Sequence, residues 1–218
     1  MRISCAGAVF SVLLFAVVAQ AYNVQTTSNG ASLAWTEFPV GYSISEEVDG
    51  GWIPIIEESF QAWEEAVGFD LVLYEGTTAA TYSDATEDLD GENTVIWVDA
   101  EWDEGAAVIG LTYDRYDEET GEILEGDLTF NAVDYCWATD GDASCMDVAD
   151  IATHEAGHFF GLDHSAVEEA TMYADAVEGE LNKADLHADD VDGIQSIYVP
   201  DESAGDGGGV GCAVTGRG

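Results

Sequence analysis

The chain has very little positive charge. Only four of its 218 residues are lysine or arginine, whereas 45 are aspartate or glutamate, so that the formal net charge is −41. Such a surface repels nucleic acid and anionic membranes, because both require cationic groups to neutralise phosphate. It is compatible with bound cations, with basic substrates, or with a saline medium that screens repulsion between like charges. A solvated acidic coat without a dedicated role is the simplest interpretation.

The chain also lacks an apolar run long enough to cross a bilayer comfortably. Its main apolar segment, residues 6–19, covers 14 residues and follows the positively charged Arg2, whereas a spanning helix needs about 20 residues. With the small residues Ala19 and Ala21 around Gln20, this arrangement predicts a signal peptide over residues 1–21, cleavage near Tyr22 and secretion. After cleavage we expect no membrane association; a retained anchor is the alternative.

Cysteine is scarce, and no two cysteines form the C-x-x-C pair of cysteine-ligated zinc sites. Secretion permits disulfides, and Cys136 and Cys145, nine residues apart, are the natural pair. Cys212 is then left over in a glycine-rich tail, residues 201–218, which we expect to be flexible. Association with the cell surface through this tail is an alternative to free secretion.

The remaining segment, residues 22–200, contains no internal repeat and is long enough for one domain with a sizeable core. Hydrophobic periodicity and turn residues predict strands over 33–48, 69–76 and 93–99, a strand pair over 106–132, and helices over 54–67, 146–160 and 186–198. Asp147 is the expected N-cap of the second helix, with Asp150 completing a capping box. This order predicts an α+β domain in which helices are stacked on a mixed sheet.

Histidine is rare as well, yet three of the four histidines lie within residues 154–164, which read HEAGHFFGLDH. On a helix His154 and His158 share one face, one turn apart, so that both imidazoles reach one ion at about 2.0–2.1 Å. Gly161 allows the helix to end, and His164 then returns from outside the helix. Three neutral imidazoles leave the fourth position of zinc for water, as in catalytic sites. The alternative, histidines packed without a metal, leaves this spacing unexplained.

The pattern HExxHxxGxxH with a downstream methionine is the metzincin signature, and the chain resembles the matrixins, the metzincin branch that includes the matrix metalloproteinases. Ser165 after the third histidine and Tyr173 directly after Met172 match matrixins. Residues 59–72, 120–131 and 186–198 resemble their first helix, last strand and C-terminal helix. The resemblance spans residues 33–200 and implies a zincin fold, with a mixed twisted sheet of about five strands and three main helices.

The resemblance implies a secreted, monomeric zinc endopeptidase that acts on proteins or peptides. Zinc would be held by His154, His158 and His164. Glu155 would act as the general base for attack of a zinc-bound water on the peptide bond. The edge strand around residues 106–112 would bind the substrate by β-augmentation.

The resemblance also predicts where the substrate side chain after the cleaved bond would enter, namely a pocket near Thr153, His154 and Tyr173. The chain departs from the matrix metalloproteinases in several respects. Only His187 lies outside the motif, so we expect their second, structural zinc to be missing. Ala174 replaces the proline that commonly follows the tyrosine, which predicts a different pocket wall. We expect neither a cysteine-switch prodomain nor a haemopexin-like domain.

Three acidic segments are candidates for structural calcium, because carboxylate and carbonyl oxygens are its preferred ligands. They cover residues 84–93, 114–122 and 140–147. Their abundance supports an alternative function, a calcium-dependent acidic binding or adhesion module with a vestigial zinc site. Casein hydrolysis with and without a zinc chelator discriminates between the two functions.

Overall fold

The computed structural model describes residues 21–86 and 89–199. The predicted tail, Cys212 and all but the last residue of the predicted signal peptide lie outside the described residues. Within the described part, no helix is long and apolar enough to cross a membrane. Its helices are α1 (Ile53–Val67), α2 (Tyr82–Thr86), α3 (Val148–Phe159) and α4 (Ala188–Tyr198).

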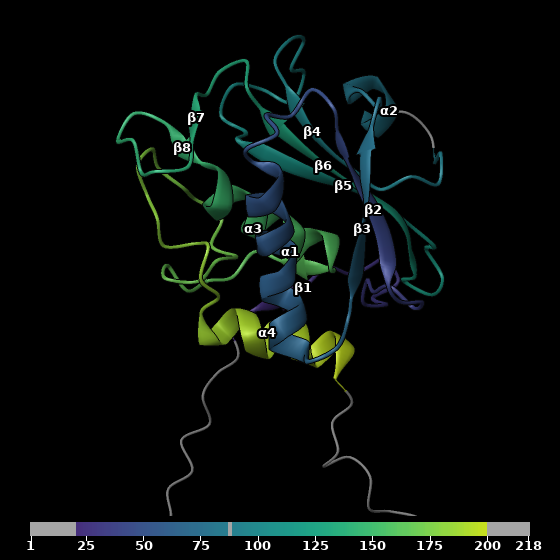
Figure 1. Cartoon of the computed structure of the whole chain (residues 1–218). Coiled ribbons are helices and arrows are strands. Elements are labelled where there is room, and N and C mark those ends of the chain that lie inside the picture. The colour runs from purple at the N-terminus through teal and green to yellow at the C-terminus, as the bar shows by residue number, and fades with distance from the viewer. Residues whose placement is uncertain (1–20, 87–88, 200–218) are drawn as a thin grey trace, which may run out of the picture.

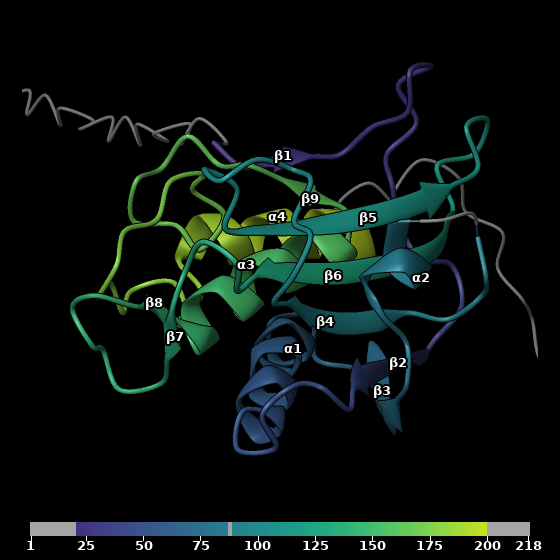
Figure 2. The same ribbon diagram turned by 90° about the horizontal axis from the view of Figure 1, so that it is seen from above.

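A five-stranded mixed sheet forms the centre of the domain, as predicted. Its strands are β2 (Val40–Ser45), β3 (Val72–Thr78), β4 (Thr94–Val98), β5 (Gly110–Tyr116) and β6 (Ile123–Asn131). Figure 2 shows them side by side in the order β3-β2-β4-β6-β5. All neighbours are parallel except β5, which is antiparallel to β6 and forms one edge of the sheet.

The central strand β4 is buried at all five positions, because both faces of the sheet are covered. Val95 and Trp97 belong to the main core, which α1 and α3 also enter. Ile96 and Val98 point to the opposite face and pack with Ala85 of α2. This second layer was not predicted, since the sequence around α2 was interpreted as an acidic loop.

The long helices follow their predicted positions. Helix α1 has Pro54 in its first turn and ends at Gly68, whose φ of 81° is left-handed. It packs against both α3 and α4, and Figure 1 shows α1 above α4. The indole nitrogen of Trp63 donates to the carbonyl oxygen of Thr153 at 3.0 Å, which ties α1 to α3. At the start of α4, His187 is the N-cap and forms a capping box with Asp190.

The remaining differences concern short strands. The strand predicted over 33–48 begins only at Val40, because the preceding segment forms single bridges, one of them between Ala34 and Glu122. Strand β1 (Asn23–Val24) pairs with β9 (Leu162–Asp163), which follows α3 in the chain. Strands β7 (Trp137–Ala138) and β8 (Met146–Asp147) pair in parallel beside the predicted Cys136–Cys145 disulfide, which is present.

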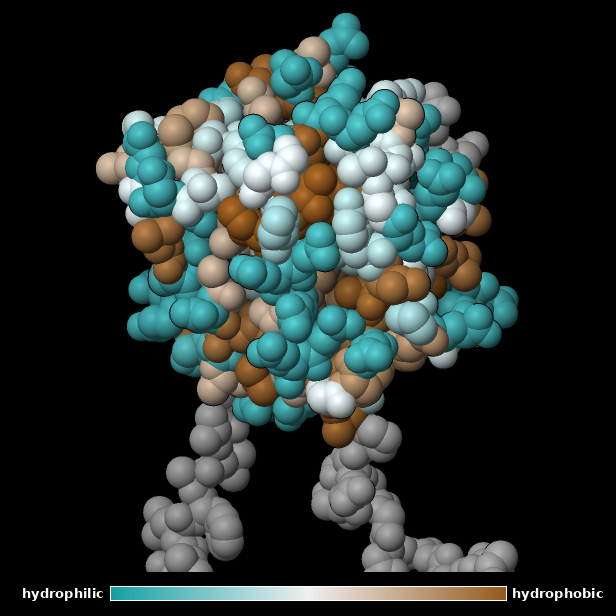
Figure 3. Space-filling view, in the orientation of Figure 1, coloured by the Kyte–Doolittle hydropathy of each residue, from teal (hydrophilic) through white to brown (hydrophobic). Residues whose placement is uncertain are grey.

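The surface matches the acidic composition. On the face shown in Figure 3, hydrophilic residues predominate and hydrophobic residues form separate patches rather than one continuous area. Such scattered apolar residues are normal for a soluble domain.

Candidate metal centre

Helix α3, which carries the motif, begins where the sequence predicted. The carboxylate of Asp147 accepts hydrogen bonds from the backbone nitrogens of Ala149 at 2.9 Å and Asp150 at 3.3 Å. The capping-box half predicted for Asp150 is wrong, because its side chain points away from the N-cap. It accepts instead from the backbone nitrogens of Asn182 and Ala184, both at 3.0 Å. Asp150 therefore fixes the segment before α4 to the first turn of α3.

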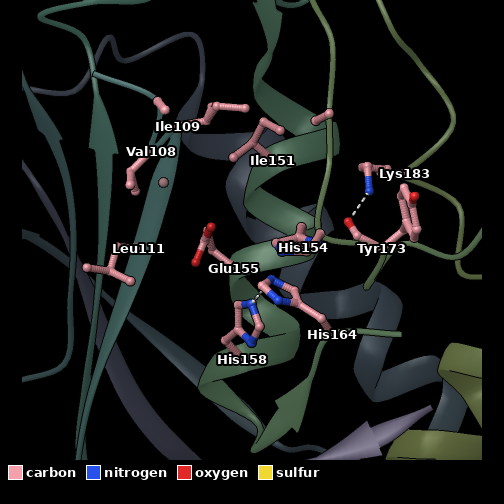
Figure 4. A pocket seen from close by; sticks show the side chains of 14 residues that line it. Val108, Ile109, Leu111, Ile151, His154, Glu155, His158, His164, Tyr173 and Lys183 are labelled. Carbon is pink, nitrogen blue, oxygen red and sulfur yellow. Dashed lines mark hydrogen bonds between the residues drawn. The ribbon is translucent and has the colours of Figure 1, made fainter. Parts of the chain in front are cut away.

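The three histidines of the motif converge on one point, as Figure 4 shows. One ring nitrogen from each of His154, His158 and His164 lies within 4.8 Å of the others. The Nε2 atoms of His158 and His164 are only 3.2 Å apart. His164 can return because Gly161 has a φ of 89°, and a Cβ there would overlap the carbonyl oxygen of Leu33. Glycine is therefore required at 161 by both conformation and space.

Backbone carbonyls fix the orientation of two imidazoles. Nδ1 of His154 donates to the carbonyl oxygen of Thr171 at 2.7 Å, and Nδ1 of His158 donates to that of Leu162 at 2.8 Å. With the proton on Nδ1, the lone pair is on Nε2, which is the arrangement typical of zinc ligands. The donor set therefore fits one zinc ion.

The protonation of the histidines also suits a metal. Burial lowers the pKa of His158 to about 4 and that of His154 well below its ordinary value. Burial lowers the pKa of His164 as well. All three imidazoles are therefore neutral near pH 7, which is the form that binds zinc.

Met172 lies under the helix rather than beside the ligands. It is buried, and a Cβ on Gly157 would overlap its sulfur and approach the Trp63 ring. Gly157 lies between His154 and His158 in the motif, so the absence of a side chain lets Met172 support the helix at the level of the ligands.

Glu155 points from the helix toward the edge strand β5. It is 4% exposed, and Oε2 accepts a hydrogen bond from the Thr112 hydroxyl at 2.8 Å. Burial raises the pKa of Glu155 to about 7, and the hydrogen bond from Thr112 acts in the opposite direction. A Cβ on Gly110 would lie 2.8 Å from Oε1, so this glycine leaves room for the carboxylate. No sequence pattern indicated Thr112, because its position opposite Glu155 depends on packing between distant elements.

A cleft of 310 Å³ adjoins the histidines and Glu155. One wall is formed by residues 107–111. The other is formed by Tyr173, Ala174 and Ala176, which follow Met172, and by Lys183 in the segment before α4. Strand β5 begins at Gly110, so the residues of the predicted edge strand before it line the cleft without belonging to the sheet.

The prediction that Thr153 lies at this pocket is wrong. On a helix, positions 151, 154, 155 and 158 share one face, and these residues line the cleft. Thr153 points to α1 instead, and its hydroxyl donates to the carbonyl oxygen of Ala149 at 2.8 Å. His154 and Tyr173 line the cleft as expected, together with Ile151 and Lys183.

Comparison with known proteins agrees with this geometry. The sequence profile of the matrixin family matches residues 35–199, which is most of the chain. The metalloendoproteinase 2-MMP of Arabidopsis thaliana is 42% identical over 69 residues, covering 28% of this chain and 18% of that protein. Matrilysin is 40% identical over 78 residues in Rattus norvegicus and 38% identical over 78 in Homo sapiens, covering in each case 36% of this chain and 28% of matrilysin. The matched stretches thus span less than a third of these relatives.

Proposed function

The chain belongs to the matrixin family, and we propose that it is a zinc-dependent endopeptidase that hydrolyses protein or peptide substrates. In this proposal His154, His158 and His164 hold the zinc, and Glu155 is the general base. The observation that carries the proposal is the convergence of three neutral imidazoles beside a buried carboxylate, at the open edge of a sheet.

The open edge of β5 supports substrate binding. Within the described residues this strand pairs with β6 on one side only. Its other edge is therefore open to pairing with an extended peptide. A peptide bound there lies over Gly110, next to the Glu155 carboxylate. A side chain on the peptide can then enter the adjoining cleft.

The chemistry is divided between the ion and the protein. Zinc, when bound, supplies a Lewis acid that polarises the scissile carbonyl and acidifies a water molecule. Glu155 accepts the proton of the attacking water and passes it to the leaving amine. Thr112 holds the Glu155 carboxylate by its hydroxyl, and the backbone carbonyls of Thr171 and Leu162 hold the His154 and His158 rings.

The proposal includes export and processing. The signal peptide would be residues 1–21, the catalytic domain 22–200 and the flexible tail 201–218. The position of Tyr22 supports cleavage at this site, because its backbone nitrogen already lies 3.1 Å from Oδ1 of Asp189. Cleavage before Tyr22 would turn this nitrogen into an ammonium group facing a carboxylate.

Structural calcium is the second part of the proposal, and its support comes from β6. Glu125 is 1% exposed, and its Oε1 has no hydrogen-bond partner within the described structure. Asp127, two residues further on the same face, is also buried, and burial raises its pKa to about 8. A cation bound by both carboxylates would relieve these costs. The charge of the nearby Arg115 acts in the opposite direction to burial and lowers the pKa of Asp127.

In the three predicted calcium segments the turn carboxylates give weaker support, whereas Asp114 of the second segment resembles Glu125, because its buried Oδ1 has no hydrogen-bond partner within the described structure. In the second and third, Asp117 and Asp142 accept hydrogen bonds from residues of their own turns. In the first, Asp84 accepts from Thr81 at the start of α2. These carboxylates therefore have partners without an ion.

The calcium proposal is tested by thermal unfolding in sodium and calcium salts of equal ionic strength. A saturable rise of the midpoint at low calcium is expected for the wild type, and it should be lost in Glu125→Gln. Equal midpoints in the two salts would leave only screening of the acidic surface.

The protease proposal is tested with Glu155→Ala and with the exposed Glu65→Ala on α1 as a matched control. We expect Glu155→Ala to keep one zinc per chain but to hydrolyse casein about 10²–10⁴-fold more slowly. Glu65→Ala should match the wild type, and a zinc chelator should abolish activity. Hydrolysis by Glu155→Ala at the wild-type rate would refute the mechanism. Calcium-dependent binding of protein without any hydrolysis would favour the adhesion module instead.

A further inference from the structure

The only lysine of the whole chain is buried in the wall of the cleft. Lys183 is 2% exposed, although the chain carries 45 acidic residues that it could pair with at the surface. Lysine is almost never fully buried without a partner, because its ammonium group loses hydration there. This location calls for a specific explanation.

The backbone around Lys183 is held in place from two sides. The neighbouring Asn182 and Ala184 donate to the Asp150 carboxylate on α3. The carbonyl oxygen of Lys183 itself accepts from the Thr171 hydroxyl at 2.9 Å. These hydrogen bonds fix the backbone that carries the Lys183 side chain, and this side chain is part of the cleft lining.

The ammonium group is partly but not fully satisfied by the protein. Nζ donates to the carbonyl oxygen of Tyr173 at 2.5 Å, as Figure 4 shows, and to that of Thr171 at 3.4 Å. An ammonium group has three N–H donors, so one remains for an acceptor that enters the cleft. Burial lowers the pKa of Lys183, whereas the carboxylates of Glu180, Asp150, Asp190 and Asp175 act in the opposite direction and favour its charged form.

The rest of the cleft is mainly apolar. The side chains that line it include Val108, Ile109, Ile151 and Ala176. Apolar walls of this kind can pack against the aliphatic part of a substrate side chain. The ammonium group of Lys183 can donate a hydrogen bond to the terminal group of the same side chain. A glutamine or glutamate side chain fits this combination, because it has an aliphatic stem and a terminal oxygen acceptor. A lysine side chain would bring two ammonium groups together.

We propose that Lys183 is a specificity-determining residue, which makes the cleft select substrates whose side chain after the cleaved bond ends in a hydrogen-bond acceptor. The inference rests on the proposed peptidase function and names its substrate class. Glutamine and glutamate are the expected residues. Of the two, glutamate gains charge attraction from Lys183 but also meets the carboxylates that surround it, so glutamine tests the hydrogen bond alone.

The test uses the zinc-loaded enzyme and four peptides that differ only in the residue after the cleaved bond, which is glutamine, glutamate, leucine or lysine. Mass spectrometry confirms the cleavage site. We expect the wild type to have a higher kcat/KM for the glutamine and glutamate peptides than for the leucine peptide, and the lowest for the lysine peptide. In Lys183→Met the ratio of glutamine to leucine should fall roughly 10- to 100-fold, mainly through KM. Lys183→Arg should retain the preference.

Leu181→Met is the matched control, since Leu181 is exposed and lies outside the cleft lining. It should leave all four ratios unchanged. If Lys183→Met does not fold, the kcat/KM values of the wild type still test the inference. A higher value for the leucine peptide than for both the glutamine and the glutamate peptide would overturn it. An unchanged ratio in a folded, zinc-containing Lys183→Met would overturn it as well.

A binding measurement separates this inference from the proposed function. Calorimetric titration of the four peptides into zinc-loaded Glu155→Ala requires no catalysis. Tighter binding of the glutamine peptide than of the leucine peptide supports the role of Lys183 even if the wild type hydrolyses nothing. Cleavage of all peptides without any such difference would instead support the protease and refute the role of Lys183.

Discussion

Replacing Thr112 by valine removes one hydroxyl group and keeps the shape of the side chain. In the wild type this hydroxyl donates to Oε2 of Glu155 at 2.8 Å, inside a site where burial already raises the pKa of Glu155 to about 7. The hydrogen bond favours the ionised carboxylate, so its loss should raise this pKa further. A hydrogen bond to a charged group contributes about 1.5 kcal/mol or somewhat more, which corresponds to roughly one pKa unit.

The assay is the pH dependence of kcat/KM for one peptide substrate. Glu155 must be ionised to accept a proton, so activity falls as the pH falls through its pKa. A higher pKa in Thr112→Val therefore moves the acidic limb to higher pH by roughly one unit. Below this limb the variant should be about tenfold slower, and well above it the two rates should approach each other. Bound zinc acts on Glu155 in both proteins, so the comparison isolates the hydroxyl.

Thr112→Ser is the control for this experiment, because it keeps the hydroxyl and loses only the methyl group. It should retain the wild-type limb. Zinc content should be equal in all three proteins, since the hydrogen bonds of the Thr112 hydroxyl go to Glu155 and not to a histidine of the triad. An acidic limb at the same pH in Thr112→Val and the wild type would refute the assigned role of this hydroxyl.

Three further predictions concern the framework of the site. Gly161→Ala should weaken zinc binding and lower the free energy of unfolding by more than the roughly 1–3 kcal/mol of a strained residue. Gly68→Ala, where a Cβ has open space, should lower it by the conformational strain alone. Equal losses of both variants in chemical denaturation would contradict the overlap of residue 161 with Leu33. Asp189→Asn should destabilise a chain that starts at Tyr22 more than one that retains preceding residues, because only the former presents an ammonium group to the carboxylate; thermal unfolding of both forms checks this. Replacement of both disulfide cysteines by serine should cost about 2–3 kcal/mol for a loop of nine residues, and an unchanged denaturation midpoint would argue against it.

The parts of the fold that the sequence predicted are those with local signals. The apolar spacing of α1, the N-cap of α3 and the continuous apolar run of β4 each arise within a short segment. The histidine triad belongs to the same class, because a helical turn and one glycine suffice to bring His154, His158 and His164 together. The family resemblance added the number of strands in the sheet and the residues expected near the substrate pocket.

The parts that the sequence did not predict depend on contacts between distant residues. Strand β1 is stable only because it pairs with β9, about 140 residues away. Helix α2 lies in an acidic segment without helical periodicity, and it forms because Ala85 fills the far face of the sheet. Thr153 and Ile151 show the same limit within one helix, since only the packing of α3 decides which face meets the cleft.

The two cations of the described chain illustrate how charge and fold are related. Arg115 reaches the carbonyl oxygen of Ala85 under α2, and Lys183 lies in the wall of the cleft. Both donate to backbone oxygens, and two cations offset little of the charge of 45 acidic residues. The exterior therefore attracts basic molecules at long range, whereas the cleft offers a donor at short range. If both effects act, the best substrates combine basic residues outside the cleft with an acceptor side chain inside it, and added salt should weaken only the first contribution.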